Sequence, residues 1–147
     1  MAKFDLDSFL PYLLNQAAER TGVDFQAVYQ DAFGLSRTQW RIMANIGQSG
    51  PMTASEICKR TLTEKSRVSR SIVGLAERGL LRRERSLDDR RAEILAFTPQ
   101  GTAMFLRIGE GALAFNEKLR AAMGDSDFAS LLRLLETLRT MQPVSTN

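Results

Sequence analysis

Apolar residues recur at helical spacing along most of the chain, and this pattern predicts a mainly α-helical protein. An apolar stripe predicts a first helix over residues 6–20. Residues 25–33 are predicted to form a second, short helix, because Gly34 follows them and glycine readily adopts the left-handed conformation that ends a helix. Residues 1–34 are therefore expected to be a helical region that contains these two helices.

Two capping boxes divide the centre of the chain into short helices. In Ser36-Arg-Thr-Gln39 and again in Thr53-Ala-Ser-Glu56, a hydroxyl and a side-chain acceptor three residues later can satisfy reciprocal backbone donors at a helix start. The first of these helices is expected to end at the glycines and proline of residues 47–51. A third helix is predicted over residues 64–78, where Gly79 can end it.

The spacing then changes from helical to extended. Residues 80–86 and 93–97 are predicted to be two short strands, and the charged residues 87–91 between them to be a turn. A helix-turn-helix that leads into a charged hairpin is the arrangement of a winged helix-turn-helix. The predicted fold class is therefore mainly α with a small β-hairpin wing, an α+β architecture in one compact chain.

Two helices are expected after the hairpin. Thr98 and Pro99 predict the start of a long helix, because threonine caps a helix and proline fits its first position. Gly124 breaks this helix, and Asp125 or Ser126 is expected to cap the last one. The apolar positions of that last, amphipathic helix are Phe128, Leu131, Leu132, Leu135, Leu138 and Met141.

The helix predicted over residues 64–78 has two different faces. At about 100° per residue, Val68, Ile72 and Leu75 fall on one side, which indicates a core face. Serines and arginines of its first half fall on the other side, where a recognition helix presents side chains to the major groove and arginine can grip guanine bidentately. The alternative is that they only solubilise an exposed helix. The candidate DNA-binding residues of this helix are Lys65, Ser66, Arg67, Ser69 and Arg70.

The tip of the hairpin is a second candidate DNA contact. Arg90 and Arg91 can enter the narrow minor groove, whose negative potential favours arginine. Asp89 is expected to orient Arg91 through a charge-assisted hydrogen bond rather than to approach DNA itself. The alternative is a solvated turn that contacts nothing outside the chain.

The positive charge of the chain is concentrated in this region. The net charge is only +3, but residues 59–91 contain eleven Lys and Arg against five Asp and Glu, a net charge of +6. Because each neutralised phosphate releases counterions condensed on nucleic acid, such a stretch favours double-stranded DNA as partner. Charge alone would favour a solvated charged face, so the prediction of DNA binding depends on the helix-turn-helix spacing.

The composition argues against an enzyme, a metal protein and a membrane protein. The chain has no histidine, no Gly-rich phosphate loop and no metal-spaced ligands, so no catalytic residue, cofactor or metal is expected. Cys58 is the only cysteine, which excludes an intrachain disulfide and fits a reducing compartment. Apolar runs are far shorter than the roughly 20 residues that cross a bilayer, and Asp5 and Asp7 stand where a signal peptide would be apolar. We therefore expect a cytoplasmic protein.

Several of these segments resemble the MarR family of transcriptional regulators. Asp89-Arg-Arg-Ala-Glu-Ile94, Phe97-Thr98 and Gly101 are similar to the Asp-x-Arg wing and the Leu-Thr-x-x-Gly signature of that family, with phenylalanine in place of the usual leucine. Residues 64–81 are similar to its recognition helix running into the wing. Ser86 stands where many members place an acid. The order of six helices and one wing agrees over nearly the whole chain.

The resemblance implies a homodimer in which residues 1–34 and 99–147 form interlocking dimerisation helices and residues 35–98 form the winged helix-turn-helix. It also implies a sequence-specific repressor of a pseudopalindromic operator, released by a small aromatic effector. Aromatic residues at helical spacing more often form core than a pocket. Cys58 lies far from the N-terminal cysteine of peroxide-sensing members and is expected to be a small buried residue. The candidate pocket residues are Tyr12, Tyr29, Phe33, Trp40 and Met43.

Two alternatives to this function stay open. The first is a constitutive or architectural DNA-binding protein without ligand response, in which removal of Arg70 would lower only general affinity; a specific regulator would lose discrimination between sequences. The second is a protein-interaction module that keeps the fold without the DNA contacts, and the basic wing argues against it.

Overall fold

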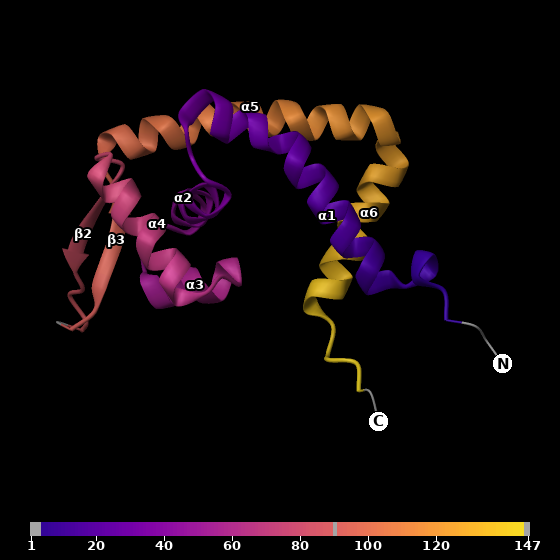
Figure 1. Ribbon diagram of the computed structural model, residues 1–147, viewed down its shortest axis with the longest axis horizontal. Coiled ribbons are helices and arrows are strands. Elements are labelled where there is room, and N and C mark those ends of the chain that lie inside the picture. The colour runs from indigo at the N-terminus through magenta and orange to yellow at the C-terminus, as the bar shows by residue number, and fades with distance from the viewer. Residues whose placement is uncertain (1–3, 90, 146–147) are drawn as a thin grey trace. The chain divides into compact units, whose positions relative to one another are not determined.

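The computed structural model describes residues 4–89 and 91–145, and the chain divides into two compact units, residues 1–110 and 111–147. The predicted mainly helical fold with a small antiparallel sheet is confirmed. In chain order the elements are η1 (Leu6–Ser8), α1 (Leu10–Gln26), η2 (Ala27–Asp31), α2 (Arg37–Ser49), β1 (Met52–Thr53), α3 (Ala54–Thr61), α4 (Lys65–Glu77), β2 (Leu81–Arg85), β3 (Glu93–Phe97), α5 (Pro99–Met123) and α6 (Asp125–Thr140) (Figure 1).

The N-terminal helix is one continuous run, where the sequence predicted two separate helices. After the 3₁₀ turn η1, α1 passes directly into the π-helical turn η2, and Gly34 ends the run with φ 65° as predicted. The break expected near residue 20 is wrong because nothing in residues 21–24 stops a helix. A single glycine there, Gly22, costs only about 1 kcal/mol.

Both predicted capping boxes are present. The Ser36 hydroxyl accepts the N–H of Gln39 at 3.1 Å, and the Gln39 side chain accepts the N–H of Ser36 at 2.9 Å. The Thr53 hydroxyl accepts the N–H of Glu56 at 3.2 Å, and the Glu56 carboxylate accepts the N–H of Thr53 at 2.7 Å. These reciprocal bonds satisfy backbone donors that a helix start otherwise leaves unpaired, and they fix where α2 and α3 begin.

The sheet has three antiparallel strands in the order β1-β3-β2. The predicted hairpin corresponds to β2 and β3, in which Leu81 is paired with Phe97. Strand β1 was not predicted, because a strand of two residues is too short to show alternation. Its Met52 is paired with Leu95, which joins the turn before α3 to the hairpin.

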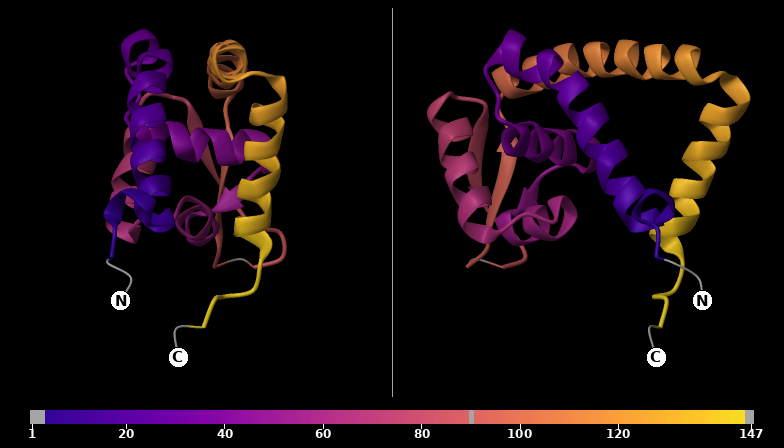
Figure 2. Two further views of the ribbon diagram at one scale, coloured as in Figure 1. Left: turned by 90° about the vertical axis from the view of Figure 1, so that its right-hand side faces the viewer. Right: turned by 45° about the vertical axis from the view of Figure 1, so that its right-hand side comes forward.

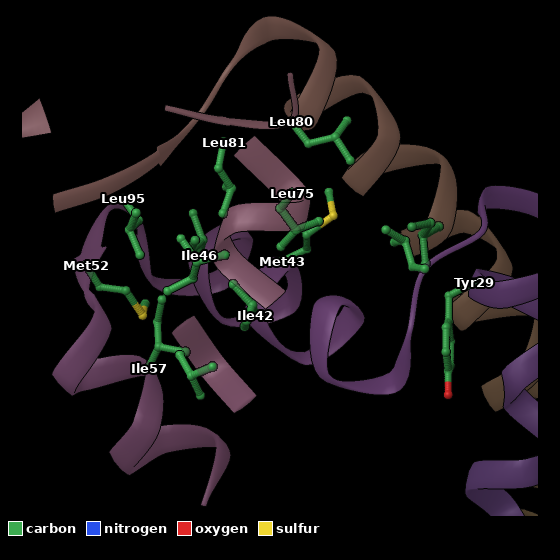
Figure 3. Packing of buried hydrophobic residues seen from close by; sticks show 14 residues of the cluster. Tyr29, Ile42, Met43, Ile46, Met52, Ile57, Leu75, Leu80, Leu81 and Leu95 are labelled. Atoms are coloured by element: carbon green, nitrogen blue, oxygen red, sulfur yellow. The ribbon is translucent and has the colours of Figure 1, made fainter. Parts of the chain in front are cut away.

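The core of the first unit is formed by apolar side chains from η2, α2, α3, α4, α5 and the strands (Figure 3). Ile42, Met43 and Ile46 of α2 lie centrally in this cluster, surrounded by residues of the other elements. Burial of each such side chain stabilises the fold by about 1.5–3 kcal/mol. The fully buried large side chains are Leu35, Ile42, Met43, Ile57, Val68, Leu75, Leu80, Leu95 and Ile108.

The end of α4 is joined to the start of α5 by the Thr-x-x-Gly segment. The Thr98 hydroxyl donates to the carbonyl of Gly79 at 2.6 Å and accepts the N–H of Gly101 at 3.0 Å. The N–H of Thr98 donates to the carbonyl of Leu80 at 3.2 Å. A Cβ atom on Gly101 would lie 2.0 Å from that same Leu80 oxygen, so only glycine fits there.

The second unit consists of the rest of α5 and α6. Gly124 separates the two helices with φ 88°, as predicted, but it is itself the N-cap of α6, which has no side-chain cap. The expectation that Asp125 or Ser126 caps this helix is therefore wrong: Asp125 is its first residue, and its carboxylate accepts a hydrogen bond from Arg120 at 2.6 Å. Phe128 is the buried residue of α6, whereas five of its leucines are 38–52% exposed.

None of the helices among the described residues is long and apolar enough to span a membrane.

Replacement of Gly101 by alanine tests the close approach of α5 to Leu80. Because the added methyl group meets a backbone oxygen, Gly101→Ala should lower the free energy of unfolding by about 3 kcal/mol. Gly109→Ala on the same helix is the matched control. A Cβ there meets nothing within 4 Å, so this variant should be about 0.5–1 kcal/mol more stable. Urea denaturation followed by circular dichroism measures both changes, and equal stabilities of the two variants would contradict the analysis.

Candidate nucleic-acid interface

Helices α3 and α4 pack against each other and against α2, and together they form a helix-turn-helix (Figures 1 and 2). The turn depends on Leu62, which has the left-handed conformation with φ 51° and ψ 40°, and its N–H donates to the carbonyl of Cys58. Buried Thr61 precedes it and donates its hydroxyl to the carbonyl of Ile57 at 2.7 Å. A left-handed residue other than glycine costs about 1–2 kcal/mol, and the Leu62 side chain is 92% exposed.

The two faces of α4 are oriented as the sequence predicts. Val68 and Leu75 are fully buried and Ile72 is 3% exposed, so the apolar stripe lies in the core. The five candidate DNA-binding side chains are all exposed, and none of them forms a side-chain hydrogen bond or ion pair with a described residue; they are Lys65, Ser66, Arg67, Ser69 and Arg70. The helix therefore presents polar and cationic groups outward from a fixed backbone.

Hydrogen bonds connect the described residues on the two sides of the wing tip. The N–H of Ser86 donates to the carbonyl of Ala92 at 3.0 Å, and the N–H of Ala92 donates to the carbonyl of Asp89 at 2.9 Å. The hydroxyl of Ser86 accepts the N–H groups of Asp88 and Asp89, both at 3.2 Å. These two hydrogen bonds hold the turn.

Asp89 contacts Arg91, but at the backbone. Its carboxylate accepts the N–H of Arg91 at 2.9 Å, so it fixes the course of the chain rather than the guanidinium as expected. The Arg91 side chain is exposed. Arg90, the other predicted wing contact, lies outside the described residues.

Three further arginines on β2 were not singled out from the sequence. Arg82 donates to the carbonyl of Phe97 at 2.6 Å, and Arg83 forms an ion pair with Glu93 at 2.7 Å. Arg85 is exposed and has no ion pair or side-chain hydrogen bond among the described residues. The basic stretch of the sequence contained all three arginines. Which of the three has a partner among the described residues depends on the pairing of β2 with β3, which the sequence did not show.

An open hollow of about 530 Å³ lies between α4, the start of α3 and the wing strands. Ser69 and Ile72 line it from α4, and Arg83 and Glu93 line it from the wing. The candidate interface is therefore not flat: a groove separates the exposed face of α4 from the hairpin.

Four of the five candidate pocket residues belong to the core cluster or pack against it, and the fifth, Tyr12, lies outside that cluster on α1. The ring of Tyr29, 3% exposed, is stacked on that of Trp40 with centroids 6.1 Å apart, and Met43 is fully buried in the core. Phe33 is half-buried under the guanidinium of Arg107, 5.1 Å from its ring centroid. Tyr12 is half-buried on α1. The hollow beside α4 and a second one of about 390 Å³ between α2, β3 and α5 are lined by none of the five.

The carboxylate of Glu56 has a lowered pKa. Hydrogen bonds from the backbone and the hydroxyl of Thr53 are the main cause, and the charges of Arg60 and Lys59 act in the same direction. The capping box that starts α3 is therefore strongest when Glu56 is ionised. Cys58, on the same helix, is half-buried and packs against the core.

A helix-turn-helix with an exposed basic second helix, followed by an ordered basic hairpin, defines the class of winged-helix DNA-binding proteins. The comparisons identify which family within that class. A model of the MarR family matches residues 33–92. The HTH-type transcriptional regulator YwoH of Bacillus subtilis (strain 168) is 31% identical over 107 residues, which are 71% of this chain and 77% of that protein.

Solved structures agree with this assignment. A MarR family transcriptional regulator from Silicibacter pomeroyi DSS-3 is 28% identical, with a TM-score of 0.80 over 92% of this chain and 96% of that one. BpsR of Bordetella bronchiseptica has the same fold at 20% identity, with a TM-score of 0.82 over 96% of this chain and 100% of that one. The chain belongs to the MarR family of transcriptional regulators, which are DNA-binding winged-helix proteins, and the resemblance seen in the sequence is confirmed.

The effect of Glu56 on stability should depend on pH. Because the pKa is lower in the folded protein than its ordinary value of 4.5, the stabilisation is present above that value and is lost as the pH falls through the folded pKa. In Glu56→Gln the amide can keep the capping box, as Gln39 does at the start of α2, but it cannot titrate. The stability difference between wild type and variant, measured by urea denaturation, should therefore shrink below pH 4.5. A difference that stays constant throughout acid titration would contradict this assignment.

Proposed function

We propose that this protein is a sequence-specific transcriptional repressor that binds a pseudopalindromic operator as a homodimer and is released by a small aromatic ligand. The proposal depends on one observation, the exposure of the polar side chains in the first half of α4. Its serines, lysine and arginines are exposed and unpaired among the described residues, directly opposite the buried Val68, Ile72 and Leu75. This geometry suits insertion of the helix into a major groove.

The side chains of α4 match the chemistry of base and phosphate recognition. Arg67 and Arg70 can each donate two parallel hydrogen bonds to O6 and N7 of guanine, and one such contact contributes about 1–3 kcal/mol of discrimination. Lys65 supplies a charge for the phosphate backbone, and the hydroxyls of Ser66 and Ser69 suit phosphates or small base contacts.

The wing supplies the second contact. Arg91 is exposed at an ordered tip, and Arg85 is an exposed, unpaired cation among the described residues at the end of β2. Arginines favour the narrow minor groove because its negative potential is enhanced there. We assign this role to Arg91 and Arg90, with Asp89 and Ser86 holding the turn.

A homodimer accounts for the apolar surface that a single chain leaves uncovered. Leu10 and Leu13 of α1 are 50% and 42% exposed, and Leu132 and Leu135 of α6 are 52% and 40% exposed. Monomeric proteins rarely expose large apolar patches, whereas subunit interfaces cover them. Two copies would also place two recognition helices in successive major grooves, about 34–36 Å apart, as a palindromic site requires.

The ligand is proposed from a related structure and from the aromatic residues. DNA binding by BpsR is regulated by 6-hydroxynicotinic acid, an aromatic acid. In this chain Tyr12, Phe33 and Trp40 are half-buried and can take part in a pocket, and Arg107 above Phe33 offers a cation for a carboxylate. We place the protein in the cytoplasm, where its DNA and such metabolites meet.

Selection of bound duplexes from a random DNA pool tests the reading role of α4. The wild-type protein should enrich a palindromic sequence, and the Arg67→Ala/Arg70→Ala protein should enrich none, because the guanine contacts are lost. Repetition of the selection with a panel of small aromatic acids tests release. Enrichment of the same sequence by the double variant would refute the assignment of these arginines. Enrichment by the wild type that no acid abolishes would favour a constitutive DNA-binding protein.

The homodimer is tested by sedimentation equilibrium. The wild type should have twice the chain mass of 16.4 kDa, and Leu132→Lys/Leu135→Lys should shift it towards the monomer, because charges would enter the apolar interface. Thr137→Lys adds a charge to an exposed polar position on the opposite side of α6 and should leave the dimer intact. A wild-type mass of 16.4 kDa at all concentrations is incompatible with the proposed architecture.

A further inference from the structure

The C-cap residue of α4 is hydrogen-bonded to the end of the N-terminal helical run. Arg78, the C-cap of α4, donates from Nη2 to the carbonyl of Phe33 at 2.6 Å and from Nη1 to the carbonyl of Gly34 at 3.2 Å. These two carbonyls are 45 and 44 residues away in the sequence. The planar guanidinium suits this arrangement because its donors diverge in a fixed fork, which a lysine ammonium does not offer.

The contact has an electrostatic reason. Phe33 and Gly34 end the helical run that begins with α1, and Gly34 turns the chain away with φ 65°. Carbonyls at a helix end have no partner within the helix and carry the partial negative charge of the macrodipole. Arg78 stands at the negative end of α4 as well. One cation therefore lies between two negative helix ends that would otherwise repel each other.

Both partners of this contact are held in place independently. On the side of α4, the N–H of Leu80 donates to the carbonyl of Leu75 at 3.0 Å and the N–H of Gly79 donates to that of Ala76 at 2.9 Å, a closed helix end. On the other side, the N–H of Gly34 donates to the carbonyl of Gln30 at 2.7 Å. Arg78 consequently links two rigid ends rather than two loops.

We infer that Arg78 is a positioning residue for DNA recognition: it sets the orientation of α4 relative to the N-terminal helical run without touching DNA. The inference rests on the proposed function. If residues 1–34 belong to the dimerisation region, this link sets the separation and tilt of the two recognition helices, and so whether both meet their half-sites at once. Arg78 then affects binding to a palindrome and has little effect on binding to DNA of random sequence.

The test compares Arg78→Gln and Arg78→Lys with the wild type in the full-length protein. Gln removes the charge and most of the donors, whereas Lys keeps the charge and removes the fork. Arg41→Gln is the control for lost charge, because Arg41 is exposed on α2 and its side chain has no hydrogen bond or ion pair among the described residues. For each protein we would measure affinity for the palindrome selected by the wild type, affinity for a random duplex, the salt dependence of both, and the thermal midpoint.

Arg78→Gln should bind the palindrome about tenfold more weakly, with unchanged affinity for the random duplex and an unchanged salt slope. Arg78→Lys should bind random duplex as the wild type does and recover only part of the palindrome affinity. Arg41→Gln should match the wild type in its preference for the palindrome. All affinities are compared at a temperature where every variant is folded, and if Arg78→Gln does not fold, Arg78→Lys decides.

Three outcomes would overturn the inference. A salt slope reduced by about one would show that Arg78 contacts a phosphate directly. An equal loss of affinity for both duplexes would show general destabilisation. Undiminished preference for the palindrome in the variants would show that the link does not position α4. If the wild type selects no DNA sequence at all, the proposed function fails, and the inference about Arg78 fails with it. This result differs from the three above because it is seen in the wild-type protein.

Discussion

The burial of one face of α4 is the constraint on which the rest of the structure depends. Val68, Ile72 and Leu75 are locked into the core with α2 and α3, so the helix cannot rotate without moving apolar surface into water. At about 1.5–3 kcal/mol for each buried side chain, such a rotation would cost much of the stability of a small domain. The outward direction of Ser66, Arg67 and Arg70 follows from this packing, since they lie on the same helix opposite those residues.

The packing fixes the rotation of α4, and its C-terminal end is fixed by polar contacts. Gly79 and Leu80 are bonded to Thr98, and the absence of a side chain at Gly101 lets α5 begin directly against the Leu80 carbonyl. The Phe-Thr-x-x-Gly segment, which resembles the family signature, thus has a structural role in this chain. It attaches α4 to the long helix that follows the wing.

Helical periodicity and capping patterns predicted most of the elements from the sequence. These patterns failed where an element depends on residues outside its own segment. The capping boxes at Ser36 and Thr53 could be predicted because all their partners lie within four residues. Strand β1 could not, because it exists only through its pairing with β3. The prediction that Asp125 caps α6 was wrong for a similar reason. The carboxylate of Asp125 is bonded to Arg120, a residue of the preceding helix, and does not cap α6.

For the candidate site, too, the sequence predicted some features, and others could be seen only in the structure. Helical periodicity was enough to predict which side chains of α4 are exposed, since the 3.6-residue repeat places them opposite the apolar stripe. It could not show that Asp89 bonds the backbone of Arg91, or that Arg83 has an ion pair with Glu93 whereas Arg85 has none among the described residues. These facts depend on turn geometry and strand register. Tyr29 and Trp40 could be identified as aromatic but not as stacked on each other.

The left-handed conformation of Leu62, in the turn before α4, affects the stability of this chain. A glycine would adopt the same backbone conformation without strain, and the leucine side chain has almost no contact with its own chain to compensate. The strain at residue 62 is therefore not offset by packing, and it lowers the stability of the turn. The side chain of Leu62 can be removed without disturbing the core beneath α4, because it lies in solvent.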